Sequence, residues 1–217
     1  MAMLTNRPAI PLWVKVAYCA FVALVVPFYW VTYSPWNFLY FCDIALLVTA
    51  VAIWIESPLL ISMQALAITI LQLIWVADFL CRLVAGVHIT GVTAYMLDSS
   101  IPLFLRALSL FHGWLPFFVL WSLSRLGYDR RALGAQSVVA IVVLFISYFF
   151  APAPPPSADH PNWAVNINYV YGLDDKHPQT IMAPPLWLLF LMAAAVGIYL
   201  PTHFVLRRLF KKAPPAR

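Results

Sequence analysis

Several ionisable or sulfur-bearing side chains interrupt the long apolar stretches of this sequence, and these residues could do chemistry. An ionisable group at membrane depth costs about 2.5–3.5 kcal/mol, so by default it marks a functional site or a paired structural group. One such stretch, residues 98–121, carries both a basic side chain and an imidazole. The candidate catalytic residues are Cys42 and His112. The charge cluster that would surround them consists of Asp43, Asp78, Arg82 and Arg106.

A pair formed by Cys42 and His112 would have the clearest chemistry. A thiol becomes a nucleophile when a base or a cation lies nearby, and His112 could take its proton. Asp43 or Asp78 could then orient the imidazole, while Arg106 could hold a phosphate or carboxylate head group. Taken singly, however, a buried cysteine more often acts as a small hydrophobic residue than as a nucleophile. A lone histidine in a helical bundle is more often a hydrogen-bonded structural residue than a catalyst.

The charged residues could instead serve the fold alone. Asp78 and Arg82 are four residues apart, the spacing at which two side chains on one helix neutralise each other. Asp43 could likewise pair with Arg106 and hold two helices together. Which interpretation applies depends on which of these side chains meet.

The composition indicates that the elements positioning these residues lie in a lipid bilayer. Of the 217 residues, 64% are hydrophobic and only 10% are charged, with a mean hydropathy of +0.87, whereas soluble domains carry about 25% charged residues. The net charge of +5 comes from basic residues near helix ends, so we expect membrane lipids as partners and no nucleic acid. A protein partner or a homo-oligomer stays open.

No motif for a bound cofactor or a familiar catalytic centre is present. The sequence has no GxSxG elbow, glycine-rich phosphate loop, HExxH or CxxC motif, and we expect no cofactor and no metal. The three cysteines all lie in apolar stretches, which does not indicate a disulfide framework.

Six segments are long and apolar enough to cross a bilayer, which takes about 20 residues each. They predict an all-α, polytopic membrane bundle in a single transmembrane domain, residues 1–217, with a proline-rich loop at 151–185 and a basic tail at 206–217. The predicted spans are 12–31, 36–55, 59–84, 101–123, 132–150 and 186–205.

Lysine and arginine mark cytoplasmic loops, and they gather at one predicted side of this bundle. The loop 151–185 holds a single Lys176, so it belongs on the opposite, outer side, and both termini are expected in the cytoplasm. Most candidate residues then fall in the outer half, except His203, which would cap carbonyls or face head groups. The basic residues that set this orientation are Arg7, Lys15, Arg125, Arg130, Arg131, Arg207, Arg208, Lys211 and Lys212.

The loop before the last span changes character at residue 162. Its NWAVNINYVYGLDDKHPQT run alternates apolar and polar residues in part, which predicts an extended piece over the mouth of the bundle. Asn166 and Asn168 would present amides on one face, and Tyr169 and Tyr171 suit the head-group level. Three neighbouring residues could be imagined as metal ligands, but their spacing matches no recognised site: Asp174, Asp175 and His177.

Three short motifs, FLYFCD, LFHGWLPF and NINY, resemble the YwaF-like bacterial integral membrane proteins and a related eukaryotic acyltransferase that remodels ether phospholipids. The resemblance implies a cysteine nucleophile at Cys42 and a histidine base at His112. It implies that Asn166, Asn168 and Tyr169 shape the outer mouth, and that the protein is a multi-pass protein of the bacterial inner membrane. The residues directly before Cys42 depart from the acyltransferase pattern, which has histidine and proline there.

Three hypotheses follow for the function. The first is a lipid acyltransferase or hydrolase that uses Cys42 and His112. The second is a non-catalytic membrane subunit or small-ligand binder, in which the charges hold helices together. The third is a proton-coupled transporter with a relay through Asp43, Asp78 and His112, which the shortage of polar residues in the inner half opposes.

Overall fold

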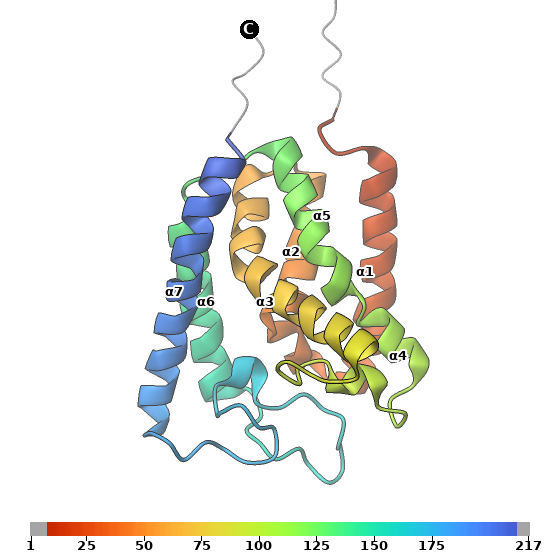
Figure 1. Ribbon diagram of the computed structural model, residues 1–217, viewed down its shortest axis with the longest axis vertical. Helices are drawn as coiled ribbons and strands as arrows, with labels where there is room; N and C mark the ends of the chain where they lie inside the picture. Colours follow the sequence, from red (N-terminus) through yellow and green to blue (C-terminus); the bar gives the residue numbers. More distant parts are fainter. Residues whose placement is uncertain (1–7, 212–217) are drawn as a thin grey trace, which may run out of the picture.

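The computed structural model describes residues 8–211, and these form helices and no strand (Figure 1). Arg7 at one end of the chain, and Lys212 with the five residues after it at the other, lie outside the described residues. The six longer helices of the described part are α1 (Leu12–Tyr33), α2 (Phe41–Trp54), α3 (Pro58–Ala85), α5 (Phe111–Leu126), α6 (Ala132–Phe150) and α7 (Pro184–Leu209). The shorter ones are α4 (Leu103–Leu108) and the 3₁₀ turns η1 (Pro35–Leu39), η2 (Ala94–Leu97) and η3 (Ile167–Tyr169).

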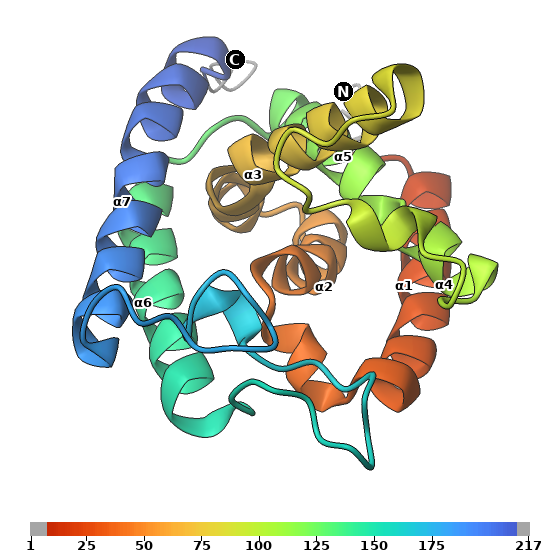
Figure 2. The ribbon, with the colours of Figure 1, turned by 60° about the horizontal axis from the view of Figure 1, so that its bottom comes forward.

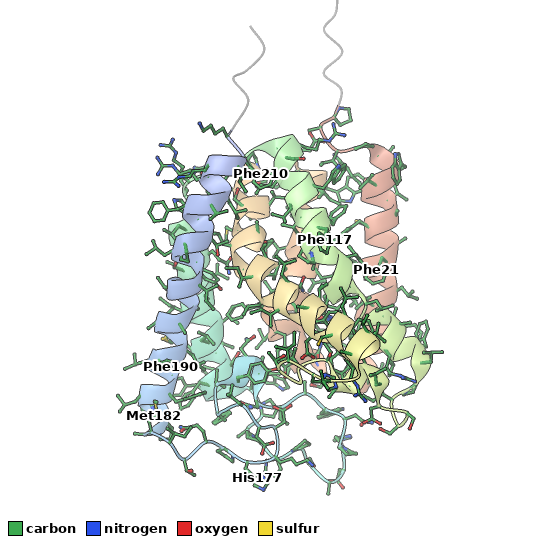
Figure 3. The ribbon with its side chains drawn as sticks, viewed as in Figure 1. Phe21, Phe117, His177, Met182, Phe190 and Phe210 are labelled. Atoms are coloured by element: carbon green, nitrogen blue, oxygen red, sulfur yellow. The ribbon has the colours of Figure 1, made fainter. Side chains whose placement is uncertain are left out.

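Five helical segments are long and apolar enough to cross a membrane: α1, α3, α4 with α5 (Leu103–Leu126), α6 and α7. The most apolar stretches of α1 and α7 are only 28% and 22% buried within the protein. Their outer faces carry large apolar side chains such as Phe190, 52% exposed, and such side chains cover the outside of the bundle in Figure 3. This surface fits an integral, multi-pass membrane protein.

The predicted second span, residues 36–55, is wrong in its extent. The first part of that stretch forms η1, and only Phe41–Trp54 is α-helical. Fourteen residues rise about 21 Å, which is less than the apolar thickness of a bilayer. Figure 2 shows α2 in the middle of the bundle with the other helices around it, so α2 is a core helix.

The predicted fourth span, residues 101–123, is interrupted. It consists of α4 and α5, which are separated at Ser109 and Leu110, and α5 continues to Leu126. The helix predicted at 132–150 is confirmed as α6, and the other three predicted spans match α1, α3 and α7 to within a few residues. Ser57 caps α3, accepting a hydrogen bond from the Leu60 N–H, and Pro58 lies in its first turn as expected.

The two ends of the bundle differ in charge and in chain connections. Helix α1 begins and α7 ends at the same end (Figure 1), together with Arg125 in the last turn of α5 and with Arg130 and Arg131 between α5 and α6. We call this the basic end. The opposite end, the loop end, holds residues 86–102 and 151–183, and Figure 3 shows His177 there, far from Phe210. Helix α3 packs against α2, α5 and α6 and forms the centre of the core.

Candidate functional site

Asp43 is buried in the first turn of α2, with one carboxylate oxygen left without a partner. Its side chain is 3% exposed, and its Oδ2 accepts a hydrogen bond from Asn37 Nδ2 at 3.2 Å and lies 3.7 Å from Cys42 Sγ. No donor among the described residues reaches its Oδ1. The amino end of a helix favours an acidic group, so the position suits Asp43, but the free oxygen still lacks a hydrogen bond.

Tyrosines from four separate segments surround this dipeptide. Each lies close enough to interact electrostatically with Cys42 or Asp43, and they come from α1, the residue before α2, η2 and η3. They are Tyr29, Tyr40, Tyr95 and Tyr169. Burial raises the pKa of the last three, so these phenols stay protonated. The Tyr40 hydroxyl donates to the Val165 carbonyl at 3.2 Å. We call Cys42, Asp43 and the four tyrosines the Asp43 cluster.

Within the described residues, no hydrogen bond joins His112 to Cys42. His112 lies in the first turn of α5, and its Nδ1 lies 2.8 Å from the Ser109 carbonyl oxygen. A carbonyl only accepts, so Nδ1 carries the proton and Nε2 is left as the basic nitrogen. The imidazole stacks on Trp75 with 5.5 Å between ring centroids. Tyr95 lies near Cys42 and near Trp75, the ring on which His112 stacks.

Asp78 and Arg82 do not pair, and the expected ion pair along one helix is wrong. Arg82 donates instead to the Gly86 carbonyl at the end of α3. The Asp78 carboxylate, 0% exposed, accepts six hydrogen bonds from the segment that follows α3. The donors are the backbone N–H groups of Ile89, Thr90, Gly91 and Thr93, the Thr93 hydroxyl and His88 Nδ1.

Arg106 does not pair with Asp43 either. Its Nε donates to the Ile101 carbonyl at 3.0 Å and its Nη1 to the Met96 carbonyl at 3.1 Å. These bonds tie the segment before α4 to α4 itself. Arg106 therefore has a local structural role in the described protein, and the suggested inter-helix pair is wrong.

The NINY segment is not extended, which corrects the prediction from its partial alternation. Asn166, Asn168 and Tyr169 have φ angles of 51°, 55° and 61°. This left-handed region is most accessible to asparagine among residues other than glycine, and it makes the chain turn tightly. The segment does cover the loop end of the bundle, as expected, but as a compact turn.

The two asparagine amides point into the protein instead of lining an open mouth. Asn168 Nδ2 donates to the Leu39 carbonyl at 2.8 Å, and its Oδ1 accepts from the Phe41 N–H at 3.2 Å. The second bond caps the amino end of α2. Asn166 Nδ2 donates to the Gly172 carbonyl at 2.9 Å, which closes the turn on itself.

The acidic residues of this loop have separate partners. Asp174 Oδ2 lies 3.1 Å from His177 Nδ1, while Asp175 Oδ1 accepts from Asn166 Nδ2 at 3.1 Å. Residues 8–211 contain no group of three histidine, cysteine or acidic side chains that could hold a metal ion. Tyr171, placed at head-group level from the sequence, donates its hydroxyl to the Tyr148 carbonyl at 2.6 Å.

Two polar contacts at the basic end were not anticipated from the sequence. Lys15, expected only to set orientation, lies 2.8 Å from Glu56 Oε1, and Glu56 also accepts the N–H groups of Ala9 and Ile10. His203, expected at carbonyls or head groups, lies with its Nδ1 2.7 Å from the Tyr128 hydroxyl. In the sequence, Lys15 and His203 stand out only as polar residues next to or within apolar stretches. This signal does not identify Glu56 or Tyr128 as their partners.

The chain was compared with protein-family models, with curated proteins and with solved structures, and no match was found in any of the three. The function is therefore inferred from the five apolar helices and from the buried, incompletely bonded acidic residue near the loop end.

Proposed function

We propose that this protein binds an amine-bearing lipid head group at the Asp43 cluster. The observation that carries the proposal is the Asp43 carboxylate, which is buried with Oδ1 unpartnered. A buried carboxylate without a full set of partners is costly, and a ligand ammonium group would supply both a charge and donors. Aromatic side chains attract such cations, and four tyrosines lie near Cys42 or Asp43. This is the small-ligand binder among the hypotheses from the sequence.

Membrane lipids are the amine-bearing compounds that the surroundings favour. The cluster lies toward the loop end of a bundle whose outside is apolar. The excess of basic residues at the other end would place that end in the cytoplasm and the cluster in the outer half of the membrane. In the bacterial inner membrane, as the motif resemblance implies, an ethanolamine head group has the required ammonium.

The test is retention of lipid by the purified full-length chain, measured by native mass spectrometry. Wild-type protein should retain phosphatidylethanolamine or phosphatidylcholine. Asp43→Asn should lose this retention by at least tenfold, because the amide carries no charge. Asp174→Asn, an acidic residue of the same end that is exposed to solvent, is the matched control and should behave as wild type. Equal lipid retention by Asp43→Asn and wild type would overturn the proposal.

Acyl transfer or hydrolysis at the same place is the second candidate, favoured by the 3.7 Å separation of Cys42 Sγ and Asp43 Oδ2. A lipid held at Asp43 would lie beside the thiol. His112 Nε2 would take the thiol proton, the sulfur would attack an acyl carbonyl, and a thioester would form as the lipid alkoxide leaves with that proton. Water or a second lipid alcohol would then release the acyl group and regenerate the thiol.

A lipid comparison of membranes tests this second candidate separately. Cys42→Ala and His112→Gln should shift the same lipid class, whereas Cys81→Ala, a free and half-buried cysteine of α3, should shift none. Unchanged lipids in folded Cys42→Ala would eliminate the catalytic candidate. The binding proposal would survive that result, because Asp43 does not require the thiol.

A further inference from the structure

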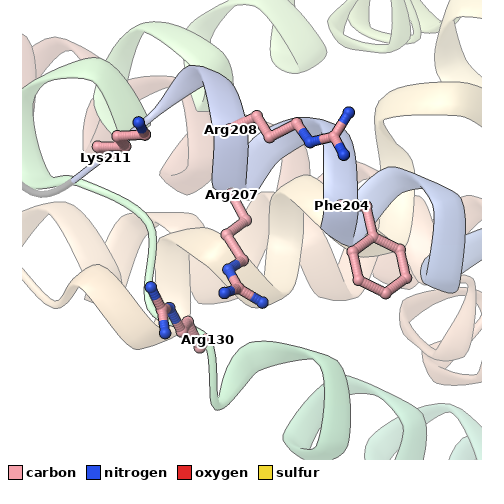
Figure 4. Close-up of a pocket in the computed structure, with 5 residues that line it drawn as sticks. All are labelled: Arg130, Phe204, Arg207, Arg208 and Lys211. Carbon is pink, nitrogen blue, oxygen red and sulfur yellow. The ribbon is translucent and has the colours of Figure 1, made fainter.

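Four cations gather around a cavity of about 410 Å³ at the basic end. One comes from the connection between α5 and α6 and three from the end of α7, and an aromatic side chain completes the wall. The lining residues are Arg130, Phe204, Arg207, Arg208 and Lys211 (Figure 4). In the close-up, the Arg207 guanidinium extends toward Arg130, so residues far apart in sequence face one space.

The described protein gives these cations no anionic partner. None of the ion pairs within residues 8–211 involves Arg130, Arg207, Arg208 or Lys211. The nearest acidic residue along the chain, Asp129, is bound by Arg131, with Arg131 Nη2 2.8 Å from Asp129 Oδ2. Like charges brought together repel one another, and an anion in the cavity would offset that repulsion.

The helix ends explain only part of this arrangement. Arg207 and Arg208 lie in the last turn of α7, where the helix dipole favours cations. Arg130 instead lies just before the amino end of α6, which is the end that disfavours a cation. The helix dipole therefore does not explain its place beside the α7 arginines, and a bound anion would stabilise it there.

The cavity also borders the lipid-facing surface. Phe204, four residues before Arg208, is 50% exposed, and Leu200 one turn earlier is 46% exposed. A ligand that fits both surfaces has an anionic group for the arginines and an apolar chain for α7. Basic pockets between membrane helices commonly hold phosphate head groups on this pattern.

We infer that this cavity binds the phosphate of an anionic phospholipid from the leaflet at the basic end. The inference does not depend on the Asp43 cluster, which lies near the other end of the bundle. Arg130 and Arg207 contact the phosphate from two sides, and the acyl chain lies along Phe204. The same phosphate chemistry is available from the soluble ion, so the experiment separates the two sources.

The test measures binding of labelled phosphatidylglycerol or phosphatidylcholine, presented in mixed detergent micelles, to the full-length chain, and competition by inorganic phosphate alone. All variants carry Asp43→Asn, which removes the head-group preference proposed for the Asp43 cluster. This chain should prefer phosphatidylglycerol, and phosphate at millimolar concentration should not displace it. Arg130→Gln and Arg207→Gln should each weaken that binding by about fivefold, and the double variant by about 25-fold. Arg207→Lys, which keeps the charge, should retain most of the binding and shows whether folding is intact.

Arg125→Gln is the matched control. Arg125 lies at the same end, against the Trp121 ring at 5.6 Å, and it does not line the cavity. Its loss should change binding less than twofold. An equal loss in Arg125→Gln would show unspecific attraction of a basic surface and overturn the inference. Displacement by inorganic phosphate, or equal binding of phosphatidylglycerol and phosphatidylcholine, would overturn it as well.

Discussion

Two buried aspartates near the loop end have opposite surroundings. Asp78 accepts six hydrogen bonds, whereas Asp43 retains an oxygen without any. The sequence marks both as acidic residues in apolar stretches and cannot separate them, because their donors lie on other segments. The unsatisfied Asp43 is the one suited to a ligand, and the satisfied Asp78 is the one suited to holding the fold.

Asp78→Ala should therefore destabilise the protein strongly. The change leaves several donors of residues 88–93 without their acceptor, and we expect a loss of about 3–5 kcal/mol in the free energy of unfolding. Chemical unfolding in detergent measures this loss. Asp98→Ala, at an exposed acid bonded only within its own turn to Ser100, should cost less than about 1 kcal/mol. Comparable losses for both variants would contradict the anchoring role of Asp78.

Glu56 should make the basic end sensitive to acid. Burial acts to raise the pKa of Glu56, but the bonds from Lys15 and from the Ile10 and Ala9 N–H groups outweigh it, so its pKa is lowered from 4.5. The unfolded chain then binds the proton more readily than the folded one. The stabilisation is thus complete above about pH 4.5 and is lost as the pH falls through the lower pKa of the folded protein.

Thermal unfolding at pH 7 and at pH 4 tests this prediction. Part of the loss of melting temperature on acidification should be absent in Glu56→Gln. Identical losses in wild type and Glu56→Gln would show that the Lys15–Glu56 contact does not contribute.

At the scale of elements, the sequence predicts helices well where they cross the whole bundle. Helix α6 has the predicted bounds because apolar residues fill it and polar loops flank it. The extent of α2 was misjudged because apolar residues continue through η1, so hydropathy alone does not reveal the break. Likewise, alternation within NINY suggested an extended chain. The tight left-handed turn that forms instead depends on hydrogen bonds to distant residues, which alternation does not reveal.

The candidate site was predictable only in part. Its centre, Cys42 and Asp43, follows from polarity within an apolar stretch. The tyrosines around it come from four segments between positions 29 and 169, and only the fold brings them together. His112 and Cys42 were expected to meet. The Nδ1 of His112 lies against the Ser109 carbonyl and its ring stacks on Trp75, so the pairing of Nε2 with the Cys42 thiol stays a prediction.

Asn168→Ala should loosen the turn that covers α2. The variant loses the bonds to the Leu39 carbonyl and the Phe41 N–H and forces alanine into a left-handed conformation. We expect a cost of about 2–3 kcal/mol and faster proteolysis of residues 151–183. Asn168→Gly should recover about 1 kcal/mol, because glycine accepts the conformation. Asn162→Ala, at an exposed position of the same loop, is the control, and proteolysis as slow in Asn168→Ala as in this control would refute the capping role.

For the whole molecule, the orientation in the membrane is a prediction from charge. The basic end should face the cytoplasm and the loop end the outside. In a chain whose three cysteines are replaced by alanine, Ser157→Cys should react with an impermeant maleimide in intact cells. Ser124→Cys, at the exposed end of α5, should react only after permeabilisation. The reverse pattern would invert the orientation and place the Asp43 cluster in the inner half of the membrane.

Recognition of an ammonium group by the buried carboxylate is tested most directly by titrating the purified chain with short-chain lipids that differ only in head group. In the Arg130→Gln/Arg207→Gln chain, whose basic-end cavity has lost two of its cations, phosphocholine and phosphoethanolamine lipids should bind at least tenfold more tightly than phosphoglycerol lipids of equal chain length. Adding Asp43→Asn should make this chain bind all three alike. Equal affinities before Asp43 is changed, or a preference that survives Asp43→Asn, would contradict that recognition.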